Sequence, residues 1–175
     1  KGFERFRIPL SKIPAEHLPP DNRYLRPIFR DKRNLEVSEN NFSDDIRRAL
    51  ETSKYLIVIC SPEAAGSKWV EKEIRCFLKT HNNNLGAIIP IIFKGHPGSG
   101  DQNECLPSVL NCEEICHRNL PRMMPDEGET EQQAWQNGMI QAISYMLHVK
   151  PESIKTSIDA ERIRFYQRCI FIAIV

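Results

Sequence analysis

The chain has 175 residues, 41% hydrophobic and 27% charged, which is the size and composition of one globular domain with a hydrophobic core. A net charge of +1, without any long run of like charges, excludes a strong general attraction to nucleic acid. The six cysteines have no paired spacing, which favours free thiols in a reducing cytoplasm over a disulfide framework.

The first part of the chain predicts one strand, one loop and one helix. Leu25–Phe29 is a short apolar strand, and Pro27 places it at a sheet edge. The polar stretch Asp31–Asn41 is a loop. Ser43 is a good N-cap for a helix that ends near Ser53, with two aspartates in its first turn.

The central part predicts a strand, a helix and a second strand. Tyr55–Cys60 is a continuous apolar run, typical of a strand buried on both faces. Ser67 caps the following helix. Ala87–Phe93 is another apolar strand. The core stripe of the helix consists of Val70, Ile74, Phe77 and Leu78.

Beyond a long polar loop from Gly95 to Gly128, one more helix is expected over Glu131–Leu147. Its apolar face contains Trp135, Met139, Ile143 and Met146. Lys150–Ala160 resembles a linker. The last seven residues, Cys169–Val175, are an apolar run far shorter than the about 20 that span a bilayer. They are either the beginning of a membrane helix or a short core strand.

Strands that alternate with helices predict an α/β fold around a parallel sheet. Trp69 and Glu73 are four residues apart, so they lie side by side on one helical face. The helix follows a buried strand, at the sheet edge where open α/β folds bind ligands. A glutamate on the flank of an amphipathic helix is also an ordinary surface residue, and both interpretations remain open.

The sequence resembles the Toll/interleukin-1 receptor (TIR) domain family, in particular its bacterial branch. The likeness rests on Phe29-Arg30-Asp31, Leu35, the Ile46–Ser53 helix, Tyr55–Pro62 and Trp69-Val-Glu-Lys-Glu73. It implies a flavodoxin-like parallel sheet with helices on both faces. The first strand of that fold is not found, so residues 1–148 are interpreted as a TIR domain truncated at its N-terminus. Residues 149–175 are interpreted as a linker and the start of a transmembrane or partner helix.

The resemblance also implies an activity and a site. Many TIR domains cleave NAD⁺ at the nicotinamide–ribose bond, in bacterial defence or signalling, and their catalytic glutamate matches Glu73. The substrate-binding residues carried over are Arg30, Asp31, Leu35, Ser61 and Trp69. NAD⁺ is the substrate, and no separate cofactor is expected. Nicotinamide leaves as a neutral molecule, so one carboxylate that stabilises the ribosyl cation is sufficient and no partner acid is needed.

Two other functions compete with this one. A non-enzymatic TIR adaptor would bind other TIR domains through the Arg30–Asn41 loop. A response-regulator-like module would need acidic residues where the chain has Cys60-Ser61-Pro62. Catalytic TIR domains also self-associate, so other TIR domains are the expected protein partners. The parent protein is expected in the cytoplasm, membrane-anchored if Ile170–Val175 begins a membrane helix.

No metal site is expected. Cys105, Cys112, Cys116 and His117 have metal-binding side chains, but their spacing fits no zinc motif. The glycine-rich segment Gly95–Gly100 lacks the lysine and the following helix of a phosphate-binding loop, so it is interpreted as a plain loop.

Overall fold

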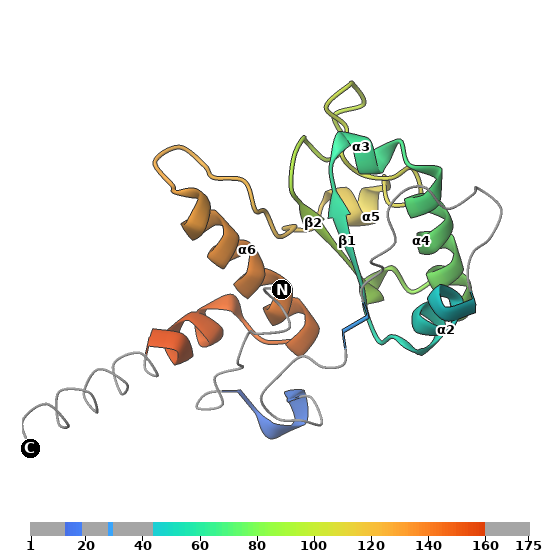
Figure 1. The fold of residues 1–175 in the computed structure, drawn as a ribbon. Coiled ribbons are helices and arrows are strands. Elements are labelled where there is room, and N and C mark those ends of the chain that lie inside the picture. The colour runs from blue at the N-terminus through green and yellow to red at the C-terminus, as the bar shows by residue number, and fades with distance from the viewer. Residues whose placement is uncertain (1–12, 19–27, 30–43, 160–175) are drawn as a thin grey trace, which may run out of the picture. The chain divides into compact units, whose positions relative to one another are not determined.

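The computed structural model describes residues 13–18, 28–29 and 44–159, and Figure 1 shows their helices and strands. Contacts divide the chain into two units, Lys1–Ile28 with Ile140–Val175, and Phe29–Met139. The second unit contains the sheet and the candidate site. The elements in chain order are η2 (Ala15–His17), α2 (Asp44–Thr52), β1 (Leu56–Cys60), α3 (Pro62–Ala65), α4 (Lys68–Thr80), η3 (Leu85–Ala87), β2 (Ile88–Ile92), α5 (Glu113–Cys116) and α6 (Glu131–Leu147).

The sheet is parallel. β1 pairs with β2 in a register that sets Leu56 opposite Ile88 and Cys60 opposite Ile92. On the other side of β2, Ile92 forms a parallel bridge with Arg122. The Ile92 N–H donates to the Pro121 carbonyl and the Met123 N–H donates to the Ile92 carbonyl, both at 2.8 Å. The parallel pairing and the helices between the strands confirm the predicted α/β fold.

Two helices cover one face of the sheet. In Figure 1, α2 and α4 lie side by side next to β1. Their apolar faces form one core cluster with Val58 and Cys60 of β1 and with Ile88 and Ile92 of β2. The predicted stripe of α4 is confirmed at Ile74, Phe77 and Leu78, which are buried, whereas Val70 is half-buried. This packing fixes the direction in which the remaining faces of α4 point.

The prediction that β1 is buried on both faces was wrong. Ile59 is 50% exposed, and Phe93, which directly follows β2, is 54% exposed. On the same face, Ile89 and Ile91 of β2 are buried. Within the described residues, β2 has neighbours on both sides, whereas β1 is paired along one edge only. An apolar run shows that a strand can be buried on both faces, but the elements packed against it determine whether it is.

Helix α6 has the predicted bounds. Its predicted apolar face is confirmed at Met139 and Ile143, which are buried, but not at Trp135, which is 42% exposed. Ala134 is buried instead, and Gly138 packs so closely that a Cβ there would lie 2.4 Å from the Arg122 carbonyl oxygen. Helix α6 thus packs against the Arg122 backbone through its glycine, and Ala134, one turn earlier on the same face, is buried.

The linker expected at Lys150–Ala160 is instead helical over residues 151–159. Pro151 suits the first turn of a helix, where its missing N–H would have no partner. Ile154 and Ser157 are fully buried. Of the expected Leu25–Phe29 strand only residues 28–29 are described, and they are not part of a strand. The expected Asp31–Asn41 loop and the apolar Ile170–Val175 segment lie outside the described residues. Among the described helices, none has the length and apolar character that a membrane crossing requires.

Candidate functional site

Two serine caps set up the helices after β1. Ser61 directly follows the strand, and its hydroxyl accepts a hydrogen bond from the Ala64 N–H at 3.2 Å, which begins α3. Ser67 begins α4 in the same way, accepting from the Val70 N–H at 3.4 Å, as the sequence predicted. Both caps bond an N–H that has no partner within its helix. Trp69 and Glu73 therefore fall in the first two turns of α4.

Trp69 and Glu73 are in direct contact. The indole Nε1–H donates to Glu73 Oε1 at 3.0 Å. Both side chains are half-buried. The Lys72 ammonium lies 5.9 Å from the centre of the indole ring, within range of a weak cation–π attraction. The four-residue spacing thus does more than place the two side chains on one face, because the indole fixes the orientation of the carboxylate.

The orientation of the Glu73 carboxylate limits the chemistry that it can support. The indole that holds Glu73 is a neutral donor, and a hydrogen bond from a neutral N–H to a carboxylate orients the group without adding a positive charge to it. A positioned negative charge in a half-buried site stabilises positive charge that develops beside it. The geometry therefore suits chemistry that passes through a cationic centre, and it also suits binding of hydroxyl groups.

The structure uses the Ser61 hydroxyl as a helix cap. The same hydroxyl interacts with the Glu63 carboxylate and is the largest cause of the lowered pKa of that group. The role of Ser61 in substrate binding remains a prediction. The same holds for Trp69, whose indole N–H donates a hydrogen bond to Glu73. Arg30, Asp31 and Leu35 lie outside the described residues, so their role in substrate binding stays a prediction.

The carboxyl end of β2 adds residues that the sequence interpretation missed. The N–H groups of Phe93 and Lys94 donate to the Cys60 carbonyl at 2.9 and 3.3 Å, so this segment continues beside the end of β1. Phe93 and Ile59 are the exposed apolar side chains there. Lys94 Nζ lies 3.6 Å from Glu63 Oε1, both exposed. The sequence signal for this site was Phe93, an aromatic residue at the last position of an apolar strand run.

The surroundings of Cys60 and of the glycine-rich loop explain their roles in the structure of the domain. Burial, then the nearby Cys105, raises the pKa of the Cys60 thiol to about 12, which leaves it protonated and unreactive at neutral pH. In the described part of the chain, no group of three His, Cys, Asp or Glu side chains could hold a metal. The loop that begins at Gly95 is closed by Glu104, whose carboxylate accepts from the N–H groups of Gly98, Gly100 and Leu106 and from the Asn111 side-chain amide.

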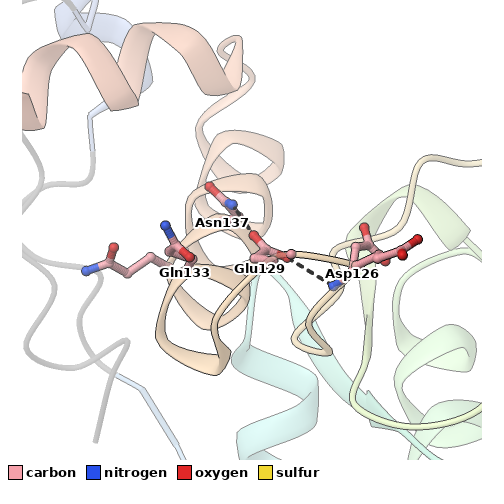
Figure 2. A pocket seen from close by; sticks show the side chains of 7 residues that line it. Asp126, Glu129, Gln133 and Asn137 are labelled. Atoms are coloured by element: carbon pink, nitrogen blue, oxygen red, sulfur yellow. Dashed lines mark hydrogen bonds between the residues drawn. The ribbon is translucent and has the colours of Figure 1, made fainter.

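A hollow of about 450 Å³ lies at the N-terminal end of α6. Figure 2 shows Glu129 at its centre, bonded to the Asp126 N–H at 3.3 Å and to the Asn137 side-chain amide at 2.6 Å. Its lining comes entirely from residues between Asp126 and Asn137, with none from α3 or α4. The Glu129 carboxylate of this hollow therefore stabilises its own loop.

A parallel α/β sheet, with a capped helix after β1 that presents a hydrogen-bonded Trp–Glu pair, is the arrangement expected of a TIR domain. The sequence matches the family described as "TIR domain" over residues 17–118, which is more than half of the chain. The chain belongs to the TIR domain family.

A curated relative is similar over part of the chain. NAD(+) hydrolase ApTIR of an Actinoplanes species is 36% identical over 77 residues, which cover 42% of this chain and 10% of that protein. The present chain therefore corresponds to a small part of that relative. No solved structure matches the chain.

Proposed function

We propose that this TIR domain cleaves NAD⁺ at the nicotinamide–ribose bond, with Glu73 as the catalytic residue. The observation that carries the proposal is the 3.0 Å hydrogen bond from Trp69 Nε1 to Glu73 Oε1, which holds a carboxylate in a fixed orientation beyond the end of β1. The similarity to a relative named as an NAD(+) hydrolase supports the same reaction.

The reaction needs only one carboxylate. The nicotinamide ring of NAD⁺ is cationic and leaves as a neutral molecule, so no acid has to protonate it. As the bond breaks, positive charge moves to the ribose, and the Glu73 carboxylate stabilises that charge. Water then adds to the ribosyl carbon and releases a proton, giving ADP-ribose; an internal adenine nitrogen in its place gives a cyclic product. Glycoside hydrolysis with a poor leaving group needs two carboxylates instead.

Other groups at the same sheet edge complete the proposed site. Phe93 presents an exposed ring at the carboxyl end of β2, a surface on which a heterocycle can stack. Lys94 adds a positive charge next to it for a phosphate. We further propose that the loop containing Arg30, Asp31 and Leu35 closes over the substrate when TIR domains associate, in bacterial defence or signalling.

The experiment measures nicotinamide release from NAD⁺ by the purified protein over a range of protein concentrations. Glu73→Gln should lower the rate by about a hundredfold or more, because the neutral amide cannot stabilise a cation. Glu71→Gln is the matched control: it lies on the same helix, two residues earlier, and its carboxylate is bound by Arg75 at 2.6 and 3.0 Å. It should retain most of the activity.

Full activity in the Glu73→Gln variant would remove Glu73 from the mechanism. If the wild-type protein releases no nicotinamide at any concentration yet still self-associates, the domain acts instead as an adaptor that binds other TIR domains.

A further inference from the structure

Arg122 occupies a fixed position at the carboxyl edge of the sheet. It lies opposite Ile92, the last residue of β2, in a parallel bridge secured by two hydrogen bonds of 2.8 Å. On its other side, Gly138 packs so closely that an added Cβ would lie 2.4 Å from the Arg122 carbonyl oxygen. The backbone from which this guanidinium extends is therefore held by the strand and the helix together.

Among the described residues, the Arg122 guanidinium has neither a hydrogen-bond acceptor nor an ion-pair partner. Its Nε atom is buried, with no hydrogen-bond acceptor in reach. The ion pairs of the described residues also leave Arg122 out, whereas Arg75 and Arg118 each hold a carboxylate. Buried polar N–H groups are almost always bonded, so an orphan at a ligand-binding edge of an α/β sheet indicates a missing partner.

The surroundings of Arg122 favour a negatively charged ligand. Burial, then the Glu104 charge, raises the pKa of the Cys105 thiol to about 11, and the Arg122 charge opposes that rise. Cys105 is therefore a neutral neighbour at physiological pH. Glu104 is committed to the backbone N–H groups of its own loop. The positive charge of Arg122 is thus left for a group from outside the described residues.

We propose that Arg122 is the anchor of a phosphate-binding site at the carboxyl end of β2, in which its Nε–H and a terminal N–H bind two oxygens of one phosphate group. The planar guanidinium fork matches two oxygens of a phosphate, and it stays charged at all physiological pH values. The phosphate is either part of a nucleotide or free inorganic phosphate. The inference does not depend on NAD⁺ cleavage.

The Nε–H of an arginine can be observed directly in a ¹H–¹⁵N NMR spectrum of the labelled full chain. The Arg122 signal is assigned by its loss in Arg122→Lys. Titration with inorganic phosphate, and separately with ADP, should shift this signal along a saturating curve. Sodium chloride of equal ionic strength should not shift it. The Arg118 signal is the internal control, because that guanidinium already binds the Leu85 carbonyl and the Glu114 carboxylate.

Calorimetry on variants supplies the second measurement. Arg122→Gln should weaken phosphate or ADP binding by about tenfold or more, the range expected for one charge-assisted bidentate contact. Arg75→Gln removes the same charge from an exposed ion pair and should leave binding unchanged. Arg122→Lys, which keeps the charge and most of the stem, should show an intermediate loss if the fork geometry is used.

The two ligands distinguish the source of the phosphate. Saturation by inorganic phosphate, with no tighter binding of ADP, assigns the site to free phosphate. ADP that binds at least tenfold tighter assigns it to a nucleotide. The proposal is overturned if neither ligand moves the Arg122 signal, or if Arg122→Gln binds both as well as wild type. Water alone then satisfies the buried N–H.

Discussion

The indole N–H of Trp69 donates a hydrogen bond to the carboxylate of Glu73, 3.0 Å away and one turn further along α4. The two residues of the motif therefore act as one unit, in which an apolar ring with a polar edge sets the direction of a negative charge. If Glu73 is the catalytic residue, Trp69 has a positioning role that is separable from the packing of its ring.

Trp69→Phe tests that role, because it keeps an aromatic ring and removes the N–H. We expect kcat for NAD⁺ cleavage to fall by about tenfold, the effect of losing one hydrogen bond to a charged group, with a smaller change in KM. Trp135→Phe makes the same chemical change on α6, where the indole is 42% exposed, and should leave kcat unaltered. Equal kcat values in both variants would mean that the indole only fills space.

His81 joins the C-terminal ends of two helices. Its Nε2 donates to the Ser53 carbonyl at 2.8 Å, and its ring stacks on Phe77 with 3.9 Å between the ring centres. His81→Ala removes both interactions and should lower the free energy of unfolding by about 2–3 kcal/mol in urea titrations. His117→Ala is the control, since its side chain is 78% exposed. A loss below about 0.5 kcal/mol at His81 would contradict the role.

Alanine should destabilise the protein at Gly138 but not at Gly66. Within a helix, alanine is favoured over glycine by about 1 kcal/mol. At Gly138 the new Cβ would lie 2.4 Å from the Arg122 carbonyl oxygen, so Gly138→Ala should destabilise the protein by about 1–3 kcal/mol despite that preference. At Gly66 the nearest atom would be 3.8 Å away, so alanine should be neutral or stabilising there. Thermal unfolding of both variants measures these changes in stability. A Gly138→Ala variant that is more stable than wild type would mean that α6 does not approach Arg122 so closely.

The lowered pKa of Glu104 predicts that the stability of the protein depends on pH. Burial by itself would raise its pKa, but the N–H groups of Leu106, Gly100 and Gly98 outweigh it and hold the pKa below the ordinary value. A carboxyl group with a lowered pKa stabilises the fold above its unfolded pKa of about 4.3, and the effect is lost as the pH falls through its folded pKa. Glu104→Gln should therefore cost roughly 1 kcal/mol at pH 7 and progressively less in acid.

Urea unfolding of wild type and Glu104→Gln between pH 7 and pH 3 measures that difference. Glu127→Gln is the control, because Glu127 is exposed and no described residue donates a hydrogen bond to its carboxylate. Its difference from wild type should stay small throughout. A Glu104→Gln difference that does not shrink in acid would show that the loop does not depend on the ionised carboxylate.

The sequence alone determined the features that depend on local spacing. Apolar periodicity and serine caps predicted α4, β1, β2 and α6, and the four-residue interval placed Trp69 beside Glu73. These features follow from backbone geometry within one or two turns, so they need no knowledge of distant neighbours. The same pattern was sufficient to indicate the family.

Only the tertiary structure decided what those elements face. The exposure of Ile59 and Phe93 depends on which elements lie beside β1 and β2. The exposure of Trp135 and the close approach of Gly138 to Arg122 depend on how α6 packs. The bridge between Ile92 and Arg122 and the hydrogen bond from His81 to Ser53 join residues far apart in the chain. Such contacts are set by the packing of whole elements, which local spacing does not encode.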